Sequence, residues 1–395
     1  MNSIWKRLSV MALLAGAIAS GASAQVLYDA NSWEATGGPP NWVPGSIVPQ
    51  NGWIGLSADD GSYNPITVAT LLGSQTITPA TGTQMQRIIG HAQPNRNSYV
   101  WVDLGARYAN RTPGNNSIWV TSDIFLPGVE ASTGVREQGI DSFDFPGTFI
   151  AGWTVINRDR AFILDGSGTL SDPGGTYGAI IFDNFLPRDE WIRVEKVLDY
   201  DNNLIEAFVN GVQIVFLLNN QLQHGWPLFG GTPRAFNDAD LVSYGATGGT
   251  TTSLFTDNYR VAAVRSINFS GKVEVQDTSV GQAARRIFVF FELLDENGNS
   301  RTGHIPIRSL IPDSGNPDLG TYLVRFHNVP NGNYRLYIKG ELHLSRVIPV
   351  TVSGSGTVIV PPVTLLGGDA NGDDAVDVLD LAELITAFDS SDGDP

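Results

Sequence analysis

Oxygen-bearing side chains recur at regular intervals near the end of the sequence. From position 369 the chain reads D-A-N-G-D-D-A-V-D-V-L-D. In a twelve-residue calcium loop, side chains at positions 1, 3 and 5, a backbone carbonyl at 7, a contact from 9 and a carboxylate at 12 surround the ion. The spacing therefore predicts a calcium site made by Asp369, Asn371, Asp373, the carbonyl of Ala375, Asp377 and Asp380.

Charge repulsion also favours a cation inside this loop. Four carboxylates brought within a few ångström of one another repel strongly, so the loop needs a positive charge to fold. The alternative is a solvated acidic tail, because residues 369–395 hold eight Asp and one Glu without Lys or Arg. A helix should follow the loop, since apolar residues come next at helical spacing: Leu381, Leu384, Ile385 and Phe388.

The loop and the helix after it resemble half of a type I dockerin. In that family two loop-helix repeats bind calcium and dock onto a cohesin domain, so the resemblance implies a cohesin-like partner or docking within the chain. Three features depart from the family pattern. Asp374 stands where the loop consensus has Gly, Val378 and Leu379 replace the cohesin contacts, and the chain stops at Pro395, which we interpret as a truncated sequence.

The first residues predict export. Lys6 and Arg7 precede an apolar run at 10–18, and Ala22-Ser23-Ala24 precedes Gln25. We therefore expect residues 1–24 to be a signal peptide, and the mature protein to be secreted or held at the cell surface. No later stretch is apolar enough to span a bilayer, and the absence of cysteine is typical of a bacterial exported protein.

Composition narrows the fold and the partners. A net charge of −16 repels phosphate backbones, which argues against nucleic acid as a partner. The 44 Gly, the 22 Pro and the 10% of aromatic residues favour a β-rich, turn-rich fold.

Short alternating segments fill residues 25–265, and no helical period interrupts them. Examples are 98–104 (SYVWVDL) and 117–126 (SIWVTSDIFL), and Asn210-Gly211 between apolar residues predicts a hairpin at 204–216. Such a series of strands predicts one large β-sandwich. The region resembles the concanavalin A-like or laminin G-like jelly-roll superfamily. Three segments carry that resemblance: 50–53 (QNGW), 191–198 with its hairpin, and 256–261 (TDNYRV).

A smaller module of strands follows at 266–366. Its phrase NVPNGNYRLYIKG, at 328–340, resembles the prealbumin-like β-sandwiches that act as spacers in bacterial surface proteins. The predicted fold is thus mainly β. It comprises a jelly-roll sandwich at 25–265, a small sandwich at 266–366 and a short EF-hand-like loop-helix at 367–395.

A catalytic carboxylate pair is not recognisable in the jelly-roll region. The nearest match to E-x-D-x-x-E, the pattern of a retaining β-glucanase, is GIDSFD at 139–144, which lacks the first Glu. Glu190 and Glu195 share a strand but fall on opposite faces. The histidines are scattered, and His91, His224 and His304 lie among turn residues, where an exposed structural role is expected.

Aromatic and polar residues alternate with aliphatic ones in two of the strands. Val100, Val102 and Leu104 should face inward in one, and Ile118, Val120 and Ile124 in the other. The opposite faces are candidates for a concave sugar-binding surface. Its residues would be Tyr99, Trp101, Asp103, Trp119 and Asp123. The alternative is that these aromatics pack under a loop or a neighbouring module.

These features predict an exported, non-catalytic protein that binds or attaches to extracellular polysaccharide and carries a calcium module. Two alternatives stay open. One is a glycoside hydrolase or polysaccharide lyase on the jelly-roll domain, and the other is a structural cell-surface protein.

Overall fold

The computed structural model describes residues 24–36, 40–55, 65–90, 98–130, 137–144, 147–156, 160–167, 177–218, 221–228, 235–244, 252–276, 287–313, 316–354 and 356–389. They form two compact units. The N-terminal sandwich comprises Ala24–Asn210 and Gly225–Val264, and the C-terminal unit holds Gly211–His224 and the chain from Arg265. Of the expected signal peptide only Ala24 lies in the described part.

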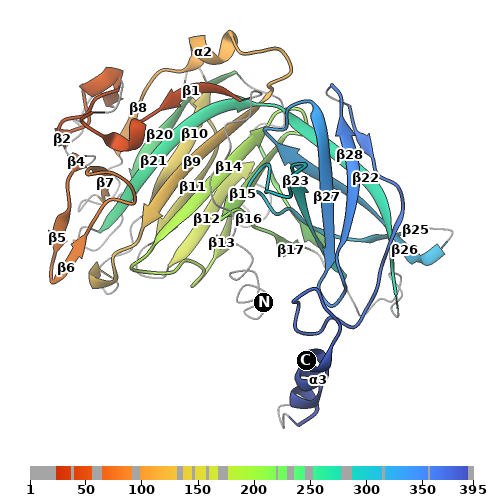
Figure 1. The fold of residues 1–395 in the computed structure, drawn as a ribbon. Helices are drawn as coiled ribbons and strands as arrows, with labels where there is room; N and C mark the ends of the chain where they lie inside the picture. Colours follow the sequence, from red (N-terminus) through yellow and green to blue (C-terminus); the bar gives the residue numbers. More distant parts are fainter. Residues whose placement is uncertain are drawn as a thin grey trace. The chain divides into compact units, whose positions relative to one another are not determined.

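One sheet of the N-terminal sandwich is antiparallel, in the order β15-β14-β9-β21-β7-β4-β2, with β1 beside β21 and β19 beside β15 (Figure 1). Its strands are β1 (Gln25–Asp29), β2 (Gly45–Ser46), β4 (Pro65–Thr67), β7 (Met85–Ile89), β9 (Ser117–Phe125), β14 (Trp191–Asp199), β15 (Leu204–Val209), β19 (Trp226–Pro227) and β21 (Ser253–Val264).

The second sheet of this sandwich is antiparallel too, in the order β13-β12-β11-β10-β20-β8-β3. Its strands are β3 (Ile54–Gly55), β8 (Ser98–Trp101), β10 (Glu137–Asp144), β11 (Thr148–Ile156), β12 (Ala161–Ser167), β13 (Tyr177–Phe182) and β20 (Phe236–Tyr244). A separate hairpin joins β5 (Thr70–Leu72) to β6 (Gln75–Ile77), and three short turns are helical: η1 (Asn31–Trp33), η2 (Gln50–Gly52) and η3 (Gly128–Glu130).

Alternation along the strands places aliphatic residues between the two sheets. The predicted inward residues Val100 on β8 and Ile118 and Ile124 on β9 are fully buried, and so is Leu104, which lies beyond the end of β8. Polar side chains also cross this core. Lys196 on β14, fully buried, donates a hydrogen bond of 2.7 Å to the carbonyl of Ile140 on β10. Its ammonium therefore links the two sheets through the middle of the core.

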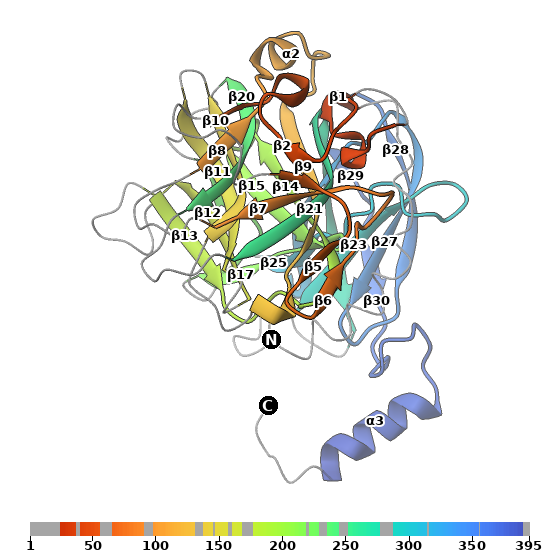
Figure 2. The ribbon, with the colours of Figure 1, turned by 90° about the vertical axis from the view of Figure 1, so that its left-hand side faces the viewer.

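β8 ends at Trp101, although the strand had been expected to continue to Leu104, and a short helix, α2 (Gly105–Ala109), begins after Leu104. The helix lies beside β20 at one end of the sandwich in both views (Figures 1 and 2). Asp103 accepts a 3.1 Å hydrogen bond from the N–H of Gly105 and so fixes the turn into the helix. No helical period marks so short an element, which explains why the sequence did not reveal it.

The predicted turn at Asn210-Gly211 is confirmed by its backbone. Both residues have positive φ, 49° and 79°, as a two-residue hairpin turn requires. β15 precedes the turn and β16 (Val212–Gln213) follows it.

The C-terminal unit contains a second sandwich, made of two sheets. One has the order β25-β26-β22-β29 with β30 beside β22, and the other has the order β24-β23-β27-β28. The strands are β22 (Ser266–Val275), β23 (Phe288–Leu294), β24 (Ile307–Ser309), β25 (Ile311–Asp313), β26 (Asn316–His327), β27 (Gly332–Gly340), β28 (Arg346–Val352), β29 (Val358–Ile359) and β30 (Val363–Leu365). β17 (Phe216–Leu218) and β18 (Gln221–Gln223) form a hairpin in the same unit.

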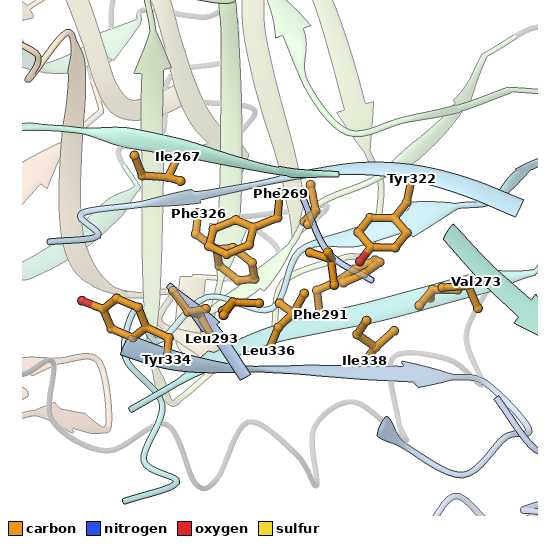
Figure 3. Packing of buried hydrophobic residues seen from close by; sticks show 14 of the residues in the cluster. Ile267, Phe269, Val273, Phe291, Leu293, Tyr322, Phe326, Tyr334, Leu336 and Ile338 are labelled. Carbon is orange, nitrogen blue, oxygen red and sulfur yellow. The ribbon is translucent and has the colours of Figure 1, made fainter. Parts of the chain in front are cut away.

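Apolar residues from both sheets fill this second sandwich. Phe269 and Phe326 meet edge to face at 5.3 Å, and Phe291 packs on Tyr322 at 4.6 Å (Figure 3). His304 is buried at 1% exposure near His327, so the expectation of an exposed turn histidine was wrong. Helix α3 (Val378–Asp389) comes after the acidic loop.

The predicted fold class is confirmed: both units are built of stacked sheets of mostly antiparallel strands, with β22 parallel to β29 and β30, and a short loop-helix follows them. Within the described ranges no helix has the length and apolar character to cross a membrane.

Candidate functional site

The two end residues of the predicted calcium loop are buried and turned inward. Asp369 is fully buried and accepts hydrogen bonds from the N–H groups of Gly372 (2.7 Å) and Asp374 (3.1 Å). Asp380, 6% exposed, accepts from those of Ala370 (2.7 Å) and Asn371 (3.2 Å). The carboxylates at loop positions 1 and 12 thus point into the same turn of chain.

The second half of the loop caps α3. Asp377 accepts a 2.7 Å hydrogen bond from the N–H of Leu379, and its own N–H donates to Asp380 at 2.7 Å. Asp377 is thus the N-cap of α3 and bonds its second helical residue, while Asp380, the third, accepts from the N–H of Asp377 as in a capping box. Backbone N–H donors, that of Asp377 first, lower the pKa of Asp380. The remaining ligand candidates, Asn371 and Asp373, hydrogen-bond each other at 3.0 Å.

Asp374, at the loop position where the consensus has Gly, takes the left-handed conformation expected there, with φ 70°. Its side chain reaches the C-terminal sandwich. One oxygen accepts from Lys339 Nζ (3.1 Å) and the N–H of Ser345 (2.8 Å), and the other from Ser345 Oγ (2.5 Å) and the hydroxyl of Tyr337 (3.1 Å). Burial opposes ionisation, but the hydrogen bonds from Ser345 and Lys339 bring the pKa of Asp374 below its usual value.

Lys339 forms an ion pair with the first loop residue as well. Its ammonium, 4% exposed, contacts Asp369 and donates a 2.8 Å hydrogen bond to the carbonyl of His343. Across the described residues, no group of three or more His, Asp or Glu side chains is close enough together to hold a metal ion. The loop's donors fit calcium by type and by the inward direction of Asp369 and Asp380, and calcium itself stays a prediction.

The predicted sugar-binding residues do not share one surface. Tyr99 and Trp101 lie on β8 in the second sheet, and Asp103 follows them. Trp119 and Asp123 lie on β9, in the other sheet. A period of two shows which residues share a face of one strand, but it does not show which sheet that strand joins.

Trp119 and Asp123 belong to a structural network on β9 and β14. The indole of Trp119 is 3% exposed and donates a 2.8 Å hydrogen bond to Glu195. Arg193 pairs with Glu195 at 3.3 Å and with Asp123 at 3.6 Å. Trp119 is therefore buried within this network of β9 and β14 and is not open to a ligand.

Two acidic residues of β20, Asp238 and Asp240, lie beside Asp141 of the neighbouring strand β10, and the sequence pattern had not indicated them. Asp240 is the direct cross-strand partner of Asp141, and Asp238 hydrogen-bonds Asp240. Burial first, and then the neighbouring carboxylates, raise the pKa of Asp240, and burial also raises that of Asp238. The hydroxyl of Tyr244 donates to Asp141. Alternation on β20 could have indicated that its acids share a face, but not that they meet β10.

A pocket of about 770 Å³ opens beside α2 and includes one predicted residue, Asp103. Its polar lining comes from segments far apart in the chain: Asp103, Arg111, Asn116, Tyr200, Asp201 and Asn237. Tyr108 from α2 adds an aromatic wall, with the guanidinium of Arg111 stacked 4.1 Å from its ring centre. We refer to this cavity as the α2 pocket.

Two donors of the α2 pocket are buried without a partner among the residues described. They are the hydroxyl of Tyr200 and Nε of Arg111. Buried polar atoms of folded proteins nearly always find a partner, so such exceptions call for an explanation. Burial, ahead of neighbouring charges, raises the pKa of Tyr200 well above its ordinary value, and burial also raises that of Tyr108. Both phenols therefore stay protonated and able to donate.

In sequence, the chain matches no protein-family model and no curated protein. In structure, it is similar at a TM-score of 0.36 and 10% identity to an endo-β-galactosidase from Clostridium perfringens, over 80% of this chain and 79% of that one. It is also similar to an alginate lyase from Chlorella virus (TM-score 0.30, 11% identity, 51% of this chain and 94% of that one).

A sialidase is similar to 61% of the chain, with a TM-score of 0.32 and 11% identity, but the match spans 18% of the sialidase. Likenesses this distant assign neither an activity nor a ligand. The class that the structure itself defines is an all-β protein of two sandwiches with a pocket beside α2 and an acidic loop-helix.

Proposed function

We propose that the chain is an exported protein that binds carbohydrate without cleaving it, through the α2 pocket, and that its acidic loop binds calcium. One observation carries the proposal of a ligand: the hydroxyl of Tyr200 is buried at the pocket wall with no partner in the described part of the chain. Leaving such a group unpaired costs about 1–3 kcal/mol. A ligand oxygen that accepts a hydrogen bond from this hydroxyl would offset that cost.

The chemistry of the lining supports a sugar. Carboxylates accept hydrogen bonds from sugar hydroxyl groups, and amides both donate and accept them. The pocket offers Asp103, Asp201, Asn116 and Asn237 for that purpose. The ring of Tyr108 provides an apolar face beside these polar groups. A cavity with an aromatic wall and a few convergent polar groups is the usual form of a small-ligand site.

The charges of the lining favour a neutral sugar. One guanidinium, of Arg111, faces two carboxylates, of Asp103 and Asp201, and the whole chain carries a net charge of −16. A uronate would be repelled by this balance. The same argument disfavours the polysaccharide lyase alternative, because a lyase must neutralise the carboxylate of its substrate.

Tyr200→Phe tests the pocket. The variant removes one hydroxyl and keeps the ring, so we expect several-fold weaker retention on a neutral polysaccharide in affinity electrophoresis. Its thermal unfolding temperature should be no lower than that of the wild type, because the substitution also removes a buried hydroxyl without a partner among the described residues. Tyr322→Phe is a matched control, since the hydroxyl of Tyr322 is also buried without a partner among the described residues but belongs to the C-terminal sandwich and does not line the α2 pocket. Equal retention of Tyr200→Phe and wild type would remove the pocket from the site.

Calcium would be held by Asp369, Asn371, Asp373, the carbonyl of Ala375, Asp377 and Asp380, and would neutralise the repulsion among their carboxylates. Titration of the full chain with calcium chloride in a calorimeter should give one ion per chain. Asp373→Ala should weaken that binding at least tenfold, because it removes a charged ligand and no hydrogen bond to the C-terminal sandwich. No heat with the wild type would refute the calcium proposal.

A glycoside hydrolase is the second candidate, favoured by the adjacent carboxyl groups of Asp238 and Asp240 with their raised pKa values. Both side chains are buried, at 6% and 5% exposure, which argues for binding over hydrolysis. Measuring reducing ends on the same glycans separates the two. Product release that disappears in Asp240→Asn would replace the binding proposal by the enzyme, and neither retention nor release would favour a structural role.

A further inference from the structure

Position 6 of the acidic loop holds Asp374, where the calcium-loop consensus has Gly. A tight turn there needs positive φ, which Gly adopts without strain and Asp does not. The chain nevertheless places Asp374 at that position with φ 70°. The side chain of Asp374 can offset this strain through contacts that Gly cannot make.

The carboxylate of Asp374 gains four hydrogen bonds, all from the C-terminal sandwich. Lys339 and Tyr337 come from β27, and Ser345, which provides two of the bonds, precedes β28. The side chain therefore ties the loop to two neighbouring strands of that sandwich. This contact is separate from the backbone hydrogen bonds that shape the loop itself.

Lys339 uses every donor of its ammonium at this junction. The three N–H groups of a lysine match three acceptors here: Asp369, Asp374 and the carbonyl of His343. Lys339 is 4% exposed and Asp369 fully buried, so neither charge has water as an alternative partner. A buried charge of either sign is costly without the other.

We propose that Lys339 is a built-in counter-ion of the acidic loop, which together with Asp374 docks the loop on the C-terminal sandwich in the absence of calcium. The partner of this loop is then the chain's own sandwich, and calcium strengthens a loop that is already folded. Because Lys339 places a positive charge beside Asp369, it also weakens the attraction of that carboxylate for the ion.

Hydrogen exchange of the full chain, followed by mass spectrometry in EGTA and in calcium, tests this. Wild type should protect the amides of residues 372–380 in EGTA. Lys339→Met should lose at least tenfold of that protection in EGTA and recover it in calcium. Asp374→Gly, which installs the consensus residue, should behave in the same way because it removes the docking carboxylate and no calcium ligand.

Lys272→Met is the matched control. Lys272 also pairs with an aspartate on this sandwich, Asp313, but at a side chain 44% exposed, so its loss should leave the loop protected. Amides of β22 and β26 report in each variant whether the sandwich is folded. If folded Asp374→Gly and Lys339→Met keep wild-type protection in EGTA, the docking proposal is wrong. A loop that ignores calcium in every variant refutes the calcium site alone.

Discussion

Trp119 belongs to an alternation of aromatic and polar residues that resembles a sugar-binding surface, but its side chain is packed inside the protein. Its indole is 3% exposed and its N–H is bonded to Glu195. Trp119→Ala should therefore lower the free energy of unfolding by about 3–5 kcal/mol, as removal of a buried aromatic does. Urea titration followed by tryptophan fluorescence measures it.

The same variant should leave glycan retention unchanged at temperatures where it stays folded, because Trp119 does not line the α2 pocket. Trp119→Phe, which keeps most of the ring and loses the hydrogen bond to Glu195, should cost less. Loss of retention in folded Trp119→Phe would return this residue to the binding site.

At the scale of the element, the turn after β15 needs glycine at position 211 for two reasons: a left-handed backbone and a carbonyl group close to its Cα. Gly211 has φ 79°, and a Cβ there would collide with the carbonyl oxygen of Gly303. Gly354 has the same φ of 79° but open space around its Cα. Both glycines lie in the C-terminal unit.

Alanine substitutions at Gly211 and Gly354 separate the cost of a left-handed backbone from the cost of the steric collision with Gly303. Gly354→Ala should cost about 1 kcal/mol, from the left-handed backbone alone. Gly211→Ala should cost at least about 2 kcal/mol, because the neighbouring carbonyl must also move. Calorimetric unfolding of both variants measures the difference, and equal costs would show that the chain around Gly303 yields freely.

Strands and turns were predictable because they depend on neighbours in sequence. The burial of Val100 and Ile124 follows from alternation, and the turn at Gly211 from its dipeptide. The α2 pocket was not predictable, since it brings Asp103 beside Asn237 through sheet pairing that no local pattern encodes. Lys339 was missed for the same reason: its partner Asp369 lies 30 residues further along the chain.

At the scale of the whole molecule, buried acids of the N-terminal sandwich set the pH dependence of stability. Burial, partly offset by hydrogen bonds from Thr81 and Asn258, raises the pKa of Asp257 to about 7. Burial likewise raises the pKa values of Asp123 and Glu130. These groups hold their protons more tightly in the folded than in the unfolded chain, where an aspartate titrates near 4.

The direction in which stability changes with pH follows from this difference in proton binding. Between about pH 4 and pH 7 the folded chain binds more protons than the unfolded one, so its stability must fall as the pH rises through this window. For Asp257 alone the loss is on the order of 4 kcal/mol, from roughly three pKa units. The stabilising contribution of the protonated group is complete below the unfolded pKa and gone above the folded one.

Urea unfolding at pH 5 and at pH 7.5 tests this, and tryptophan fluorescence reports the relevant unit, because every tryptophan after residue 24 lies in the N-terminal sandwich. Asp257→Asn should reduce the loss of stability between the two pH values, since it removes the proton that the folded state retains. Glu34→Gln, in the same sandwich, should not, because burial is outweighed by hydrogen bonds from Gln84 and Thr83, which lower the pKa of Glu34 and move its titration below the window. A wild-type stability that rises from pH 5 to pH 7.5 would contradict the assignment, since acids with raised pKa values make stability fall over that range.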